Sequence, residues 1–326
     1  MTPSERILAW LRESTEPLSG EELARRLGCS RAAVWKHVAA LRRAGYRIEP
    51  QHARGYALVA SPDRLAPTEL RPRLTGRWTE IVWRAEVDST QRLARERARA
   101  GAPEGTIVIA EAQTAGRGRL GRSWHSPPGV NLYCTVVLRP PRPPAVAPQL
   151  GLVAAVAVAD AVRETVPVPP AIKWPNDVLL DGRKVAGILT EMEGEADRVA
   201  FVLVGIGVNV NLGAADLPPE LAASATSLRA AAGAPVDRLA FTARLLAALE
   251  ARYGQFLAGG FAAIRPAFEA MAFLTGRAIR VSGPDGAVGG RVRGVDDDGA
   301  LLLEASAGGT MRVLAGEVTL RDGGGA

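Results

Sequence analysis

Residues 113–122 read Gln-Thr-Ala-Gly-Arg-Gly-Arg-Leu-Gly-Arg and combine three glycines with three arginines. The glycines match the Gly-x-Gly-x-x-Gly spacing of a dinucleotide-binding turn, but such a turn must open a helix whose N-terminus holds the pyrophosphate. Here Pro127, Pro128 and Gly129 follow, so no long helix can begin. A glycine-rich loop with three guanidinium groups instead favours the enclosure of an anionic ligand. The alternative is a solvated cluster of charges.

A second polar cluster, Lys-Trp-Pro-Asn-Asp, occupies residues 173–177. Asn176 and Asp177 carry oxygens that suit a phosphate with a hard cation such as Mg²⁺, although an Asn-Asp turn would also explain them. Lys184 lies on the returning arm of an expected hairpin, so its charge could point into the same site. Lysine is a compact point charge, unlike the flat fork of arginine. The chain has three lysines among 40 basic residues, which are Lys36, Lys173 and Lys184.

Two further motifs are less specific. Asp88-Ser89-Thr90 precedes an expected helix, so its hydroxyls either bind a polar ligand group or only cap that helix. Residues 205–211, Gly-Ile-Gly-Val-Asn-Val-Asn, have two glycines where close approach of the backbone to a ligand or a neighbouring strand is expected. The histidines show no metal-ligand spacing, and neither a zinc site nor a Ser-His-Asp arrangement is evident.

The overall composition indicates an intracellular globular protein. The 326 residues predict two or three domains, and a hydrophobic content of 47% supplies their cores. Cys29 and Cys134 lie far apart, which fits a reducing cytoplasm and argues against a disulfide framework. The longest apolar stretch, residues 150–159, is too short to cross a bilayer, and the N-terminus lacks a signal-peptide pattern. The net charge of +6 makes an anionic partner plausible.

Residues 1–60 predict a winged helix-turn-helix. The expected order is an apolar-faced helix through Leu8, a second helix that begins at Ser19, a third over residues 31–44, and a hairpin over residues 46–59. This segment holds ten Lys or Arg and six Asp or Glu. We therefore favour DNA binding by a dimer over a role in protein interaction. The candidate contacts to base edges are Ser30, Arg31, Ala33, Val34 and Lys36, and the candidate contacts to phosphates are His37, Arg42 and Arg43.

The remaining chain predicts an α+β fold with a largely antiparallel sheet and a C-terminal β-barrel. Strands are expected at residues 80–85, 106–112, 131–138 and 199–210, and helices at 91–100, 149–165 and 237–257. Residues 178–185 predict a hairpin with an Asp-Gly turn. From residue 276 onward, short strands alternate with Gly and Asp turns. The predicted domains are residues 1–62, 63–274 and 275–326.

Together these motifs resemble the family of bifunctional biotin–protein ligases and biotin-operon repressors, the BirA family, over nearly the whole length. The similarity rests on Ser-Arg-Ala-Ala-Val-Trp-Lys-His, Asp-Ser-Thr-Gln, the glycine–arginine loop, Lys-Trp-Pro-Asn-Asp, Arg-Lys-Val-Ala-Gly-Ile-Leu-Thr-Glu and Gly-Ile-Gly-Val-Asn-Val-Asn. It implies a class II synthetase-like catalytic domain with a mixed, largely antiparallel sheet, and a C-terminal SH3-like barrel. Gln91 stands where the family usually has Asn, a departure that affects one polar contact.

The resemblance implies a cytoplasmic two-step enzyme. Biotin would attack ATP, with Mg²⁺, to give biotinyl-5'-AMP, and a lysine of the biotin carboxyl carrier protein of acetyl-CoA carboxylase would then displace AMP. Operator DNA and a homodimer formed with the adenylate are also implied. The implied contacts to biotin or its adenylate are Ser89, Thr90, Gln91, Gln113, Gly116, Arg117, Gly118, Arg119, Lys184 and Gly187. Those to ATP are Arg122, Lys173, Asn176, Asp177, Asn209 and Arg321, with Mg²⁺ at Asp177.

The residue types agree with this chemistry. Joining a carboxylate to a polyphosphate brings anions together, so cations and positioning carry the rate without a covalent nucleophile. Lys184 would stabilise charge on the reacting groups, and Arg119 would retain the adenylate. A DNA-binding biotin sensor without ligase turnover and a lipoate–protein ligase are the alternatives. The intact site argues against the sensor, and the arginine–glycine loop and winged helix favour biotin over lipoate.

Overall fold

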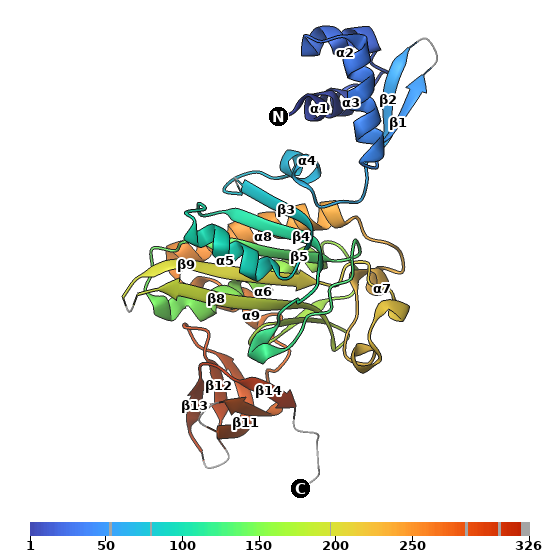
Figure 1. The fold of residues 1–326 in the computed structure, drawn as a ribbon. Coiled ribbons are helices and arrows are strands. Elements are labelled where there is room, and N and C mark those ends of the chain that lie inside the picture. The colour runs from blue at the N-terminus through green and yellow to red at the C-terminus, as the bar shows by residue number, and fades with distance from the viewer. Residues whose placement is uncertain (52–53, 79, 196, 284–285, 306–307, 321–326) are drawn as a thin grey trace. The chain divides into compact units, whose positions relative to one another are not determined.

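The computed structural model describes residues 1–51, 54–78, 80–195, 197–283, 286–305 and 308–320. Arg321, a predicted ATP contact, lies outside the described residues. The chain folds into two compact units, Met1–Arg64 and Leu65–Ala326 (Figure 1). The second unit contains both the central sheet and the C-terminal strands, so the division into three domains stays a prediction.

The first unit has the predicted winged helix-turn-helix order. Its elements are α1 (Pro3–Glu13), α2 (Gly20–Leu27), α3 (Arg31–Arg43), β1 (Arg47–Gln51) and β2 (Gly55–Ala60). Ser30 Oγ accepts a hydrogen bond from Ala33 N at 3.2 Å, which fixes the start of α3 at Arg31. The three helices and the hairpin β1–β2 surround one small core, formed mainly by Ile7, Leu8, Leu11, Leu23, Val34, Val38, Leu41 and Ile48.

A seven-stranded sheet forms the centre of the second unit. Its strands are β3 (Glu80–Val87), β4 (Thr106–Gln113), β5 (Leu132–Leu138), β6 (Pro170–Lys173), β7 (Asp177–Leu180), β8 (Arg183–Gly194) and β9 (Val199–Val208). They lie in the order β3-β4-β5-β9-β8-β7-β6, with β3 and β4 parallel and the other neighbours antiparallel. The predicted α+β class is therefore confirmed. Positive φ angles at Asp181 and Gly182 form the predicted Asp-Gly turn between β7 and β8.

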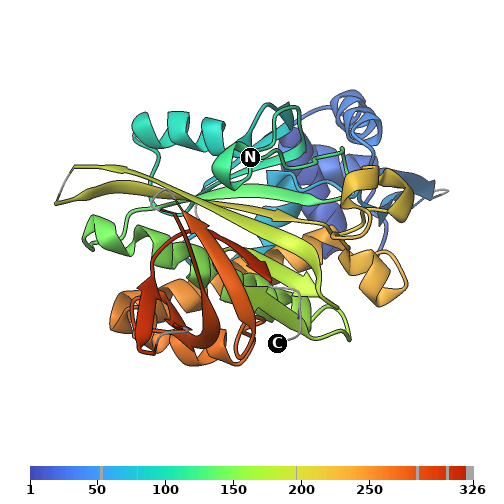
Figure 2. The same ribbon diagram turned by 90° about the horizontal axis from the view of Figure 1, so that it is seen from below.

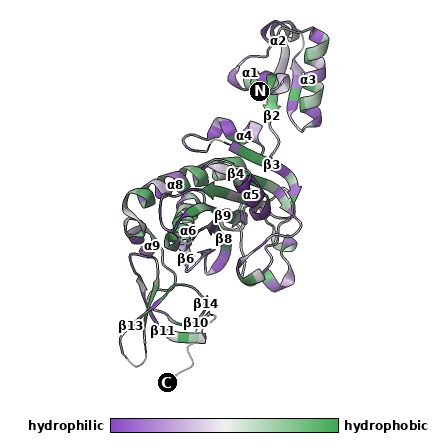
Figure 3. Ribbon diagram, turned by 60° about the vertical axis from the view of Figure 1, so that its left-hand side comes forward, coloured by the Kyte–Doolittle hydropathy of each residue, from purple (hydrophilic) through white to green (hydrophobic). Residues whose placement is uncertain are grey.

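Helices cover both faces of this sheet (Figure 2). The helix α5 (Thr90–Arg99) packs its small residues Ala94 and Ala98 on one face. The helices α6 (Ala147–Arg163) and α8 (Arg238–Gly259) lie on the other face, with the short helix α4 (Pro67–Leu70) beside α8 and α9 (Arg265–Glu269) beside α6. The short helix α7 (Leu228–Ala232) is bonded through its first residues to Asn209 and Val210, after β9. Figure 3 shows mainly hydrophilic residues on α5 and hydrophobic residues in the central strands, as a helix exposed on one face requires.

The apolar helix α6 has the predicted length of 17 residues and begins two residues before the predicted start at residue 149. With its preceding turn it spans Pro144–Arg163, which is long and apolar enough to cross a membrane by length and composition alone. However, 78% of its most apolar window is buried inside the protein, against the sheet and α8. It is therefore a core helix of the second unit.

The C-terminal strands form a small antiparallel sheet. They are β10 (Ala278–Gly283), β11 (Gly286–Val295), β12 (Leu301–Glu304), β13 (Thr310–Val313) and β14 (Glu317–Leu320), in the order β13-β12-β11-β10-β14. In the described residues the predicted barrel is thus a five-stranded sheet with β13 and β14 at its edges. Trp174 Nε1 donates to Gly299 O at 3.1 Å, and Ile279 and Leu301 join the main core, so this sheet is attached to the central one.

A buried ion pair fixes the chain where the second unit begins. Glu111 accepts hydrogen bonds from Leu65 N at 2.7 Å and Trp83 Nε1 at 3.1 Å. Its other oxygen accepts from Arg238 Nη1 at 3.0 Å, and Arg238 is fully buried. The same arginine nitrogen donates to Asn131 O at 3.0 Å. One carboxylate therefore joins the first residue of the unit to β4 and α8.

Candidate active site

A cavity of about 330 Å³ lies between the glycine–arginine loop and one end of the central sheet. Most of the predicted site residues meet there. The predicted residues that line it are Ser89, Thr90, Gln91, Gln113, Arg117, Gly118, Arg119, Arg122, Lys173, Asn176, Asp177, Lys184, Gly187 and Asn209. Gly116 is not among the lining residues; a Cβ there would lie 2.5 Å from Trp124 O, so its lack of a side chain serves packing within the loop.

Three glycines form a floor that has no side chains. A Cβ at Gly207 would lie 2.6 Å from Trp124 Cε2, and one at Gly187 would lie 3.0 Å from both Trp124 Cζ3 and Lys184 Cε. At Gly205 a Cβ would lie 2.6 Å from Gln91 Oε1. Side chains packed directly against the backbone therefore explain these glycines. The indole of Trp124 packs on Gly187 and Gly207, and the carboxamide of Gln91 packs on Gly205. We call Gly187, Gly205 and Gly207 the glycine floor.

One end of the cavity is closed by a buried network of hydroxyl and amide groups. Thr90 donates to Gln113 Oε1 from its backbone nitrogen at 2.9 Å and from its hydroxyl at 3.2 Å. Thr135 Oγ1 lies 3.0 Å from Thr90 Oγ1 and 3.1 Å from Gln91 Oε1. The Gln91 amide also contacts two backbone carbonyls, Leu189 O and Leu203 O, each at 3.4 Å. This network can orient a polar ligand group, and Gln91 forms part of it.

The motif at residues 88–90 does not cap α5 with its side chains. Ser89 occupies the cap position, but in the described structure its side chain makes no cap hydrogen bond. Instead, Ser89 N donates to Asp88 Oδ1 at 2.7 Å. Ser89 and Thr90 are buried and line the cavity, and the Thr90 hydroxyl belongs to the buried network through Gln113 and Thr135.

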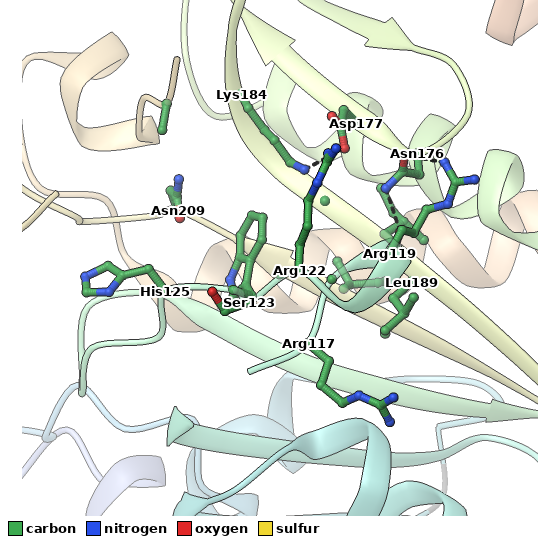
Figure 4. Close-up of a pocket in the computed structure, with 18 of the residues that line it drawn as sticks. Arg117, Arg119, Arg122, Ser123, His125, Asn176, Asp177, Lys184, Leu189 and Asn209 are labelled. Carbon is green, nitrogen blue, oxygen red and sulfur yellow. Dashed lines mark hydrogen bonds and ion pairs between the residues drawn. The ribbon is translucent and has the colours of Figure 1, made fainter. Parts of the chain in front are cut away.

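Cationic side chains converge on the opposite side of the cavity (Figure 4). Lys184 Nζ lies 2.7 Å from Asp177 Oδ1 and 5.3 Å from the centre of the Trp124 ring. Arg119 Nη1 donates to Asn176 Oδ1 at 3.2 Å, and Arg122 pairs with Glu317 of β14. These cations come from the loop and β8, and their partners come from β7, its preceding turn and the C-terminal sheet. The arrangement can bind a polyanion that replaces these internal partners.

The environment changes the acidity of these groups. Burial lowers the pKa of the Arg119 guanidinium below its ordinary value, although Asp177 and Glu317 oppose this shift. The hydrogen bond with Glu317 raises the pKa of Arg122 and lowers that of Glu317. Glu317 is thus held ionised beside a loop cation, and the loop is attached to the C-terminal sheet by charge.

Two predicted contacts have other partners. Arg117 lies over Glu191, with 3.8 Å between Nη1 and Oε1, and Figure 4 shows it directed away from Lys184. Asn209 is buried and donates from Nδ2 to Thr226 O at 3.0 Å, so its amide also supports the wall of the cavity.

The residues present fit Mg²⁺ that arrives with a nucleotide. The described residues contain no group of three His, Cys, Asp or Glu side chains that could form a complete metal cage. Asp177 offers one carboxylate beside Asn176 at the cavity. A single carboxylate together with substrate phosphates and water is the usual environment of Mg²⁺ in proteins.

Three segments match described protein families. Residues 83–209 match the Biotin/lipoate A/B protein ligase family, residues 4–57 an HTH domain, and residues 274–321 the Biotin protein ligase C terminal domain. The chain is 43% identical over 298 residues to the bifunctional ligase/repressor BirA of Bacillus subtilis, covering 90% of this chain and 91% of the relative. The chain belongs to the BirA family.

Other relatives of this BirA-family chain agree. The biotin–[acetyl-CoA-carboxylase] ligase of Mycobacterium tuberculosis is 38% identical over 269 residues, covering 78% of this chain and 97% of that one. The biotin protein ligase of Aquifex aeolicus, solved in complex with biotin and ATP, superposes with a TM-score of 0.65 and 31% identity, over 74% of this chain and 99% of that structure. The fold of the second unit is therefore that of a biotin protein ligase.

The DNA-binding candidates of the BirA-family chain lie on α3 and its cap. Arg31 and Lys36 are exposed, whereas Val34 is fully buried in the core, so its proposed contact with DNA is wrong. Ala33 is half-buried behind the Ser30 cap. The half-buried His37 has Nδ1 only 3.0 Å from Ser4 Oγ, which places its ring against α1.

The sequence prediction missed several residues at both sites. Trp124 and Thr135 at the cavity were not singled out, nor was Glu317. An aromatic residue directly after the loop was the available signal for Trp124. The sequence prediction gave no role to Trp35, which is exposed on α3.

Proposed function

We propose that this protein is an ATP-dependent ligase that activates biotin as biotinyl-5'-AMP and transfers it to a lysine of the biotin carboxyl carrier protein. The observation that carries the proposal is one cavity that joins a glycine–arginine loop and Lys184 to a buried hydroxyl–amide network. The cationic side suits phosphates, and the network suits a small polar ring. The names of the relatives support the same assignment.

In the first step a carboxylate oxygen of biotin attacks the α-phosphorus of ATP. The bond to the bridging oxygen breaks, and pyrophosphate leaves with the electron pair. Lys184 releases Asp177 and binds the phosphates, where it stabilises the charge that develops in the transition state. Arg119 releases Asn176 and binds the phosphates in the same way. Mg²⁺ bound with ATP would neutralise phosphate charge, and Asn176 and Asp177 are the residues that would hold it.

In the second step the carrier lysine attacks the acyl carbon as a neutral amine. The carbon–nitrogen bond forms as the bond between the acyl carbon and the phosphate oxygen breaks, so AMP leaves with the electron pair. The extra proton on nitrogen passes to solvent. The loop would exclude water from the mixed anhydride until the carrier arrives, with Arg119 retaining the adenylate.

The first unit would make the enzyme a repressor as well. A winged helix-turn-helix with ten basic and six acidic side chains in residues 1–60 suits operator DNA. We propose that binding of the adenylate favours a homodimer in the cytoplasm, because two such units are needed for a two-fold operator. The relative from Bacillus subtilis, named a ligase/repressor, supports this assignment.

One incubation separates the ligase from its alternatives. The full-length protein is mixed with ATP, Mg²⁺, labelled biotin and the carrier protein of acetyl-CoA carboxylase, with lipoate in a parallel reaction. Transfer of biotin is expected. Biotin retained without transfer would identify a sensor, and transfer of lipoate alone would identify a lipoate ligase. Equal affinity for operator DNA with and without adenylate, at fixed protein concentration, would contradict the coupling to repression.

A further inference from the structure

The helix α3 exposes a tryptophan between its buried residues. Val34 and Val38 are fully buried, whereas Trp35 is 60% exposed. Arg31 and Lys36 are exposed as well, so Trp35 lies on the solvent side of the helix. A single exposed hydrophobic residue is common on protein surfaces and means little without a second observation.

That second observation is the charge around Trp35. The helix carries four cations, Arg31, Lys36, Arg42 and Arg43, and no acidic residue. In the described part of the chain, no ion pair joins Arg31 or Lys36 to a carboxylate. The surface is therefore apolar at its centre and positive at its margins. Such a surface complements a ligand with anionic margins and an apolar group between them.

The other tryptophan of this unit provides a contrast. Trp10 is covered by Arg6 and Arg26, with guanidinium carbons 5.2 Å and 5.8 Å from its ring centre. No cation lies over the ring of Trp35 among the residues that the structure describes. The indole of Trp10 has partners within the unit, whereas that of Trp35 is left open to an external one.

We propose that Trp35 contacts thymine in the major groove of operator DNA. This inference rests on the proposed DNA-binding function and adds the base that is read. A recognition helix enters the major groove, where the C5-methyl of thymine is the apolar group that a base pair presents. Indole has one donor and no acceptor, so it suits apolar contact better than a bidentate pair. The neighbouring Ala32 is small and exposed, which lets the helix approach the methyl group.

The expected size of the effect follows from the burial of one methyl group. Such burial is worth ~0.8 kcal/mol, or about fourfold in affinity, for each thymine that Trp35 covers. Arg31 and Lys36 would meet phosphates, which sets affinity and salt dependence without reading sequence. Trp35 should thus affect which base sequence is bound, whereas the adjacent Lys36 should affect overall affinity and its salt dependence.

The test replaces thymine by deoxyuridine, which lacks the methyl group. Duplexes are first recovered from a random library by the wild-type protein with biotin, ATP and Mg²⁺. Each thymine in the recovered half-site is then changed to deoxyuridine, and affinity is measured for wild type, Trp35→Ala and Trp35→Phe. At the contacted positions we expect about fourfold weaker binding by wild type and Trp35→Phe, and no effect of the change on Trp35→Ala.

A salt titration provides the matched control. Lys36→Ala should reduce the slope of log affinity against log salt by about 0.9, the value for one phosphate contact, whereas Trp35→Ala should leave the slope unchanged. Circular dichroism checks that both variants keep the helical unit. Equal sensitivity of wild type and Trp35→Ala to deoxyuridine at every position would overturn the inference.

Other occupants of this surface would give different results. A drop in sedimenting mass in Trp35→Ala, with unchanged affinity for the recovered duplexes, would indicate a contact between copies of the chain and overturn the inference. A raised KM for the carrier protein, with unchanged DNA affinity, would do the same. If the wild-type protein recovers no sequence at all, the DNA-binding function fails before the role of Trp35 is reached.

Discussion

Replacing Lys184 by Met removes one charge while nearly keeping the length of the side chain. The lysine is one-third exposed and pairs with Asp177 at 2.7 Å. Near a protein surface, two unit charges ~4 Å apart interact by ~4 kcal/mol. Lys184 must give up Asp177 to reach a phosphate, so the net loss lies below that figure. It falls within the ~2.7–4 kcal/mol measured for a lost oxyanion donor, which predicts adenylation about 10²–10³-fold slower.

The assay is a single turnover with labelled ATP and saturating biotin, stopped by rapid quench and scored as biotinyl-5'-AMP. Lys184→Arg is the matched control because it keeps the charge. A Cβ at Gly187 would already lie 3.0 Å from Lys184 Cε, so a wider guanidinium has little room and an intermediate rate is expected. The double variant Lys184→Met with Asp177→Asn removes the carboxylate that loses its cation. Adenylation by Lys184→Met within about threefold of wild type would refute the electrostatic role, given the loss expected for one donor.

Four further perturbations test other parts of the structure. Gly207→Ala places a methyl group 2.6 Å from Trp124 Cε2, so it should displace the indole and weaken biotin binding by ~1–3 kcal/mol, as measured by calorimetry. Unchanged indole fluorescence would contradict the displacement of Trp124. Because the pKa of Glu317 is lowered, its pair with Arg122 exists above the ordinary carboxyl pKa and is lost as the pH falls through the lowered value. Proteolysis of the loop should therefore rise at acidic pH in wild type and be independent of pH in Glu317→Gln, and parallel profiles would argue against the pair. Glu111→Gln removes the carboxylate that lies 3.0 Å from the buried Arg238 and should lower the free energy of unfolding in urea by up to ~3–5 kcal/mol, whereas a change below ~1 kcal/mol would show that the pair is dispensable. Burial raises the pKa of Cys134 to about 12, so iodoacetamide should modify the half-buried Cys29 and leave Cys134 intact in the native protein, as mass spectrometry would show.

Local signals explain most of what the sequence predicted correctly. Ser30 begins α3 through its own cap, and the Asp-Gly turn at residue 181 joins two strands whose contacts are close in sequence. The chemistry at the loop was also readable, because glycines and arginines at fixed spacing have few other uses. These features depend on residues that are only a few positions apart, so they can be recognised in the sequence itself.

Tertiary contacts explain what was missed. Thr135 lies in the middle of an apolar strand and gains a partner only when α5 brings Thr90 to it. Arg122 and Glu317 are 195 residues apart, so their pairing depends on where the C-terminal sheet attaches. The error at Val34 was one of helical phase: its spacing with Val38 and Leu41 already predicts an inward face, and Trp35 is the residue turned outward.

The glycine floor limits how this enzyme could be redesigned to accept a different acid. Side chains added at Gly187, Gly205 or Gly207 meet existing atoms at 3.0 Å or less, so substitution there can only make the cavity smaller. New volume has to come from the closed end, where the carboxamide of Gln91 fills the region beside Gly205. Shortening Gln91, with Thr135 kept to hold Thr90 in place, is therefore the first change to try for a bulkier substrate.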